Sequence, residues 1–78
     1  MPKTTRRIGA CTRPAATLIE GRAPVDGLAY GPIRTEVYAC DEHAHAARTE
    51  WIEQPLTPFT ALAEPTTGHG CGEAVDHD

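Results

Sequence analysis

Two segments of the chain alternate between apolar and polar residues, as a strand with one buried face does. Residues 33–39 (IRTEVYA) place Ile, Thr, Val and Ala on one face and Arg, Glu and Tyr on the other. This period of two predicts the clearest strand of the chain. Residues 16–20 (ATLIE) predict a shorter strand that ends at Gly21. Residues 21–32 between them are rich in Gly and Pro, which predicts a protruding loop that joins the two strands into an antiparallel β-hairpin.

From Asp41 onward the pattern becomes helical. Asp41 is a favourable N-cap residue, and the helix must stop before Pro55. We therefore expect one helix over about 41–53, with Trp51 anchoring it against the sheet. The expected buried stripe, spaced by four, three and four, consists of Cys40, Ala44, Ala47 and Trp51.

The two ends of the chain lack a clear period. We expect residues 1–7 to form a flexible basic arm and residues 65–78 an acidic flexible tail that can fold back. Residues 57–64 (TPFTALAE) predict a short helical turn, because Thr57 suits the N-cap position and Pro58 suits the first helical position. The expected organisation is a single small domain over residues 8–64.

The composition leaves little material for a hydrophobic core. Among 78 residues, Leu and Ile each occur four times, Val three times, and Phe, Met and Trp once each. Such a core barely offsets chain entropy, whereas a structural zinc ion contributes about 10 kcal/mol or more of apparent binding free energy. Six Arg against one Lys are typical of a GC-rich bacterial or phage gene. The chain shows neither an apolar run long enough to span a membrane nor a secretory signal, so we expect a cytoplasmic protein.

The cysteines point to a metal rather than a disulfide framework, because they are three in number. Cys40 and His43 form a C-x2-H step at the start of the predicted helix, and Cys11 lies 29 residues upstream. A tetrahedral zinc site needs a fourth ligand. On a regular helix His45 points about 200° away from His43, so both cannot bind one ion.

The order of a turn with Cys11, a strand, a loop, a strand and a helix that begins with C-x2-H resembles a treble-clef zinc finger over about residues 8–53. The resemblance implies a small α+β fold in which a β-hairpin packs on one helix and Zn²⁺ is the cofactor. The expected knuckle ligand, three residues before Cys11, is replaced by Ile8. Three possibilities remain open: Cys71 or His69 folds back as the fourth ligand, water fills that position, or no metal binds.

Charge suggests two kinds of partner. Residues 1–48 hold all seven basic residues, and residues 49–78 hold six acidic residues and no basic one. We expect a non-catalytic module that contacts a protein through the loop 21–32 or the acidic C-terminal half. The alternatives are a regulator that binds nucleic acid and a metal-free structural protein. In the nucleic-acid alternative, the residues that contact phosphates are Lys3, Arg6, Arg7 and Arg13.

Overall fold

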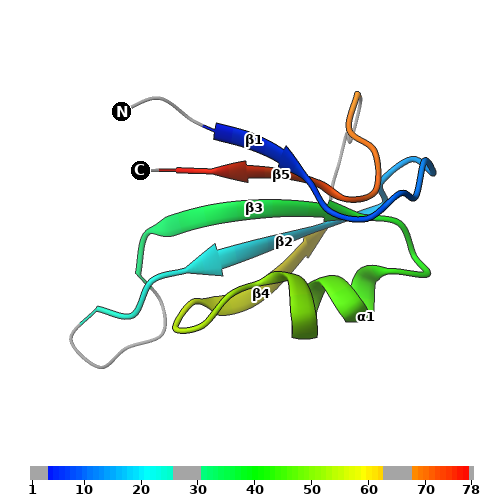
Figure 1. Ribbon diagram of the computed structural model, residues 1–78. Helices are drawn as coiled ribbons and strands as arrows, with labels where there is room; N and C mark the ends of the chain where they lie inside the picture. Colours follow the sequence, from blue (N-terminus) through cyan, green and yellow to red (C-terminus); the bar gives the residue numbers. More distant parts are fainter. Residues whose placement is uncertain (1–3, 26–30, 63–67, 78) are drawn as a thin grey trace.

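The protein folds into a five-stranded antiparallel sheet with one short helical segment on one face (Figure 1). The computed structural model describes residues 4–25, 31–62 and 68–77. The sheet order is β1-β5-β3-β2-β4. In chain order the elements are β1 (Thr4–Arg7), β2 (Thr17–Arg22), β3 (Ile33–Ala39), α1 (Ala44–Ala46), a π-helical turn (Ala47–Trp51), β4 (Thr57–Leu62) and β5 (Glu73–Asp76). The fold is thus α+β as expected, with far more strand than the predicted hairpin.

The predicted hairpin forms the centre of the sheet. β2 and β3 pair antiparallel with Ile19 opposite Val37, and the range of β3 agrees with the sequence prediction. β2 continues to Arg22, with a register shift between Gly21 and Arg22, so the expected end of the strand at Gly21 was wrong. Glycine at position 21 has a packing reason, because a Cβ there would lie 2.7 Å from Thr35 Cγ2. Part of the predicted loop, residues 26–30, lies outside the described residues.

The helix is shorter than expected. Residues 41–43 form a turn, in which the His43 N–H donates to the Cys40 carbonyl at 3.1 Å, and His43 rather than Asp41 is the N-cap. The π-helical turn then ends at Trp51. Within the described residues no helix is long and apolar enough to cross a membrane.

The core lies between the helix-bearing face of the sheet and the helical segment. Trp51 is half-buried and packs at the margin of this core, while the neighbouring Ile52 lies inside it. The predicted stripe is correct at Cys40 and Ala47, which are buried, whereas Ala44 is half-buried like Trp51. The buried apolar cluster comprises Ile19, Val37, Ala39, Cys40, Ala47, Ile52, Cys71 and Ala74.

Residues 57–62 form an edge strand instead of the predicted helical turn. β4 pairs antiparallel with β2, with Pro58 opposite Gly21. Pro58 is compatible with this place, because an edge strand tolerates the loss of one backbone N–H. The Thr and Phe residues of the segment favour a strand once a partner strand is available, and this long-range pairing overrides the local helix signal.

Both ends of the chain contribute strands that the sequence analysis placed in an arm and a tail. β5 lies between β1 and β3, with Arg7 opposite Glu73 and Val37 opposite Ala74. Ala74 is 1% exposed, so β5 supplies part of the core. Residues 4–7 and 73–76 therefore take part in pairing between segments far apart in sequence.

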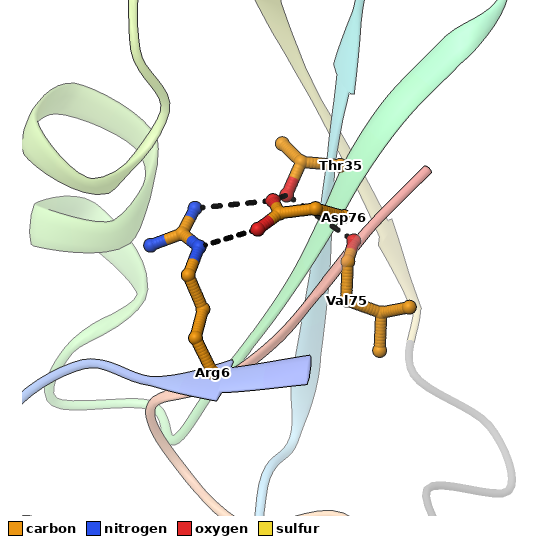
Figure 2. Close-up of polar contacts among 4 residues, drawn as sticks. All are labelled: Arg6, Thr35, Val75 and Asp76. Atoms are coloured by element: carbon orange, nitrogen blue, oxygen red, sulfur yellow. Dashed lines mark hydrogen bonds and ion pairs between the residues drawn. The ribbon is translucent and has the colours of Figure 1, made fainter. Parts of the chain in front are cut away.

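A polar contact links the three strands β1, β5 and β3 (Figure 2). The Arg6 guanidinium donates to Asp76, with Nε 2.8 Å from Oδ2, and the Thr35 hydroxyl donates to Asp76 Oδ1 at 2.8 Å. The Arg6 hydrogen bond lowers the pKa of Asp76; burial opposes this effect, and the Thr35 hydrogen bond adds to it. This contact helps to hold both ends of the chain to the central hairpin.

Candidate metal centre

Three chain segments meet at one end of the sheet, and each carries a cysteine. Cys11 follows β1, Cys40 directly follows β3, and Cys71 comes shortly before β5. β1 and β3 both run antiparallel to β5, so the ends of β1 and β3 lie beside the start of β5. The sheet topology therefore brings the three cysteines together.

Backbone hydrogen bonds hold Cys71 in this place. The Cys71 N–H donates to the Arg13 carbonyl at 2.8 Å, and the Gly72 N–H donates to the Tyr38 carbonyl at 2.8 Å. In return, the Gly72 carbonyl accepts from the Ile8 N–H at 2.7 Å. Gly72 has a φ of 91°, a conformation that favours glycine. The position of Cys71 is thus fixed by the fold of the main chain.

Four side chains bring their ligand atoms close together. The three Sγ atoms and one His nitrogen of Cys11, Cys40, His43 and Cys71 all lie within 4.8 Å of one another. His43 Nδ1 lies 3.1 Å from Cys40 Sγ and 3.5 Å from Cys71 Sγ, and the Cys11 and Cys40 sulfurs are 4.0 Å apart. Ideal tetrahedral zinc places two sulfurs ~3.8 Å apart, and a sulfur and a nitrogen ~3.6 Å apart. The four ligand atoms could therefore hold one metal ion, and their spacing is compatible with zinc.

Burial divides the four residues into an inner and an outer pair. Cys71 and Cys40 are 0% and 4% exposed, whereas Cys11 and His43 are half-buried. Burial raises the pKa of the Cys40 thiol, but hydrogen bonds from the side chain and backbone of His43, with smaller contributions from Cys71 and Cys11, lower it to about 7. Burial raises the pKa of Cys71 to about 11. The Cys40 thiolate is therefore favoured next to His43.

The surroundings hold the outer pair in place. The Arg7 guanidinium donates to the Cys11 carbonyl at 2.7 Å, and Arg13 forms an ion pair with Glu42. The second contact connects the Cys11 segment to the turn that carries His43. The His43 ring stacks with Trp51 at a centroid distance of 6.0 Å. The sequence analysis did not identify these supporting roles of Arg7, Arg13 and Trp51.

The other histidines lie apart from this group. His69, the alternative fourth ligand, stacks on Tyr38 at 3.9 Å, and its Nδ1 lies 3.2 Å from Glu73 Oε1. His45 is exposed, in keeping with the exclusion made from helical geometry. Ile8, at the position of the missing knuckle ligand, packs against the core. Of the two tail candidates, the structure places Cys71 in the group.

No protein-family model, curated protein or solved structure matches this chain. The sequence signal for Cys71 was its place in the run GHGCG, where flanking glycines let the backbone approach other segments closely.

Proposed function

We propose that Cys11, Cys40, His43 and Cys71 bind one structural Zn²⁺ ion. The observation that supports this most directly is the spacing of the four ligand atoms, all within 4.8 Å of one another. Thiolate and imidazole ligands suit zinc, and four protein ligands make a closed site of the structural type. A closed site leaves no position for a reactive water, which is consistent with a role without catalysis.

The ion would connect parts of the chain that are distant in sequence. Its ligands come from the segment after β1, the turn after β3 and the segment before β5. Three thiolates and one Zn²⁺ leave a net negative charge, and the cationic Arg7 side chain lies at the Cys11 backbone. In a domain with so small a core, such a link stabilises the folded state through the binding free energy of the metal.

Native mass spectrometry of the reduced protein, with and without a chelator, tests the metal. We expect one zinc per chain in the wild type and a loss of zinc in Cys40→Ser and Cys71→Ser. His45→Ala is the matched control, because His45 lies on the same helical segment but outside the group. A wild-type protein that takes up no zinc under reducing conditions would refute the proposal.

We also propose that the zinc-bound domain is a cytoplasmic module that contacts another protein. The local arrangement of a cysteine turn, a hairpin and a C-x2-H step at a helix supports a treble-clef-like module of this kind, as does the acidic C-terminal half. Free cysteines also suit a reducing compartment. Affinity capture from the native host tests the module: a partner should be retained by zinc-loaded protein and released by a chelator. If zinc-loaded protein captures no partner, the proposed role in protein binding is contradicted.

The nucleic-acid alternative receives less support from the contacts of the basic residues. Arg6 pairs with Asp76, Arg7 donates to the Cys11 carbonyl and Arg13 pairs with Glu42, so all three already have internal partners. Lys3 lies outside the described residues. A mobility-shift assay at low salt should show no binding that depends on these arginines.

A further inference from the structure

The three thiols of the candidate metal centre differ in how easily a small oxidant can reach them. Cys71 and Cys40 are 0% and 4% exposed, so neither presents its sulfur to solvent. Cys11 is half-buried, and it lies between β1 and β2 in a segment without regular secondary structure. Oxidation of cysteine follows thiolate character and exposure. Cys11 is therefore the thiol that an oxidant meets first.

Cys11 also has a second thiol within easy reach. Its Sγ lies 4.0 Å from the Cys40 Sγ. A disulfide requires about 2.05 Å between sulfurs, so the two atoms must approach by about 2 Å. Cys11 lies in a segment without regular secondary structure, whereas Cys40 sits at the end of a central strand, so the movement falls mainly to the Cys11 side chain. An oxidised Cys11 would thus be resolved by Cys40.

We propose that the centre is a peroxide-sensitive zinc switch, in which oxidation joins Cys11 to Cys40 and releases the metal. The inference rests on the proposed zinc site. In the first step the Cys11 thiolate attacks one oxygen of hydrogen peroxide, the O–O bond breaks, and a sulfenic acid and hydroxide form. In the second step the Cys40 thiolate attacks the Cys11 sulfur, the S–S bond forms, and the S–O bond breaks with release of a second hydroxide. The two sulfurs together lose two electrons, and the peroxide gains them.

Loss of these two thiolates leaves too few ligands to retain zinc. His43 and Cys71 would be the remaining members of the group, and a tetrahedral structural site uses four protein ligands. A dithiol reductant reverses the change by exchange with the disulfide, which restores both thiolates. Cys71 is fully buried, and once Cys11 and Cys40 are joined it is the one cysteine of the chain left without a thiol partner.

Zinc-loaded full-length protein treated with hydrogen peroxide tests the switch. The released zinc is followed with a chromogenic chelator, and the disulfide is identified by mass spectrometry of peptides digested without reduction. We expect zinc release together with one Cys11–Cys40 disulfide, and rebinding of zinc after addition of dithiothreitol. Protein incubated without peroxide is the control and should retain its zinc, and His45→Ala, which lies outside the group, should release zinc with peroxide as fast as the wild type.

The outcomes separate the two proposals. If zinc is absent before peroxide is added, the metal site itself is refuted, and the switch with it. If zinc is present but peroxide leaves it bound, or releases it without a Cys11–Cys40 disulfide, or the disulfide contains Cys71, the zinc site stands and the switch is wrong. The disulfide is identified in the wild type, so this result does not depend on the folding of any variant.

Discussion

The Sγ atom of Cys71 lies 3.5 Å from Nδ1 of His43, although 28 positions separate the two residues in sequence. The contact joins the segment before β5 to the turn that follows β3. It exists because the Cys71 backbone is hydrogen-bonded to Arg13 and the next residue to Tyr38. The last ligand of the candidate centre therefore depends on strand pairing rather than on local sequence.

Replacement of Cys71 should abolish tight zinc binding, whereas replacement of His69 should not. Removing a residue that only hydrogen-bonds to a metal ligand weakens metal binding by about 10–100-fold. Cys71 is proposed to bind the metal directly, so we expect Cys71→Ser to weaken zinc binding by more than about 100-fold. His69 instead contacts Tyr38 and Glu73. Competition with a chromogenic chelator measures both affinities. Equal losses in Cys71→Ser and His69→Ala would contradict the assignment of Cys71.

Removal of zinc should lower the melting temperature of the wild type. Free zinc at 100 times its dissociation constant stabilises the folded state by about 2.7 kcal/mol, and for a domain of this size that corresponds to about 10–20 °C. Calorimetry with zinc and with excess chelator measures the difference. In Cys40→Ser the chelator should change the melting temperature little, and a similar drop in both proteins would show that the chelator acts elsewhere.

Gly72→Ala should weaken both folding and zinc binding, with Gly68→Ala as the matched control. Both glycines have positive φ, 91° and 89°, so an alanine is strained at either position. A Cβ at residue 72 would in addition overlap the Ile8 carbonyl oxygen, whereas nothing lies within 4 Å of one at residue 68. We expect Gly72→Ala to cost about 1–3 kcal/mol more than Gly68→Ala in denaturant unfolding. Equal costs would show that the backbone at residue 72 has room to move.

The Asp76 carboxylate should make the fold sensitive to acid. The hydrogen bond from Arg6 lowers the pKa of Asp76 below its unfolded value of about 3.9. The interaction therefore contributes fully above about pH 4 and is lost as the pH falls through the lower pKa of the folded state. In Asp76→Asn this contribution is absent at every pH, so the wild type should lose stability below about pH 4 more steeply than the variant.

Denaturant unfolding at several pH values measures this difference. At neutral pH we expect Asp76→Asn to cost about 1 kcal/mol, because Asp76 and Arg6 are partly exposed and solvent screens their attraction. Both proteins are compared at the same zinc concentration, so that loss of the metal in acid affects them equally. Exposed Glu50→Gln is the control, and parallel pH profiles for wild type and Asp76→Asn would contradict the role of this contact.

Local pattern predicted the centre of the fold well and its edges poorly. The alternation over Ile33–Ala39 is a property of one segment, and it identified β3 with its observed bounds. The Thr-Pro pair at residues 57 and 58 is compatible with both a helix start and an edge strand. The segment is a strand because it pairs with β2. β5 is only four residues long, so its strand character comes from lying between β1 and β3.

The sequence by itself determined the central hairpin, the chemical type of the candidate centre and the exclusion of His45. These depend on period, residue type and helical geometry, all of which are local properties. The glycines that flank Cys71 made it the preferred fourth ligand, but only the tertiary structure decided between Cys71 and His69, because the two lie close together in one glycine-rich segment. The pairing of β5 with β3 and β1 places Cys71 inward, fully buried, and leaves His69 against Tyr38. Such long-range pairing is a cooperative property of the whole chain, which no short window of sequence contains.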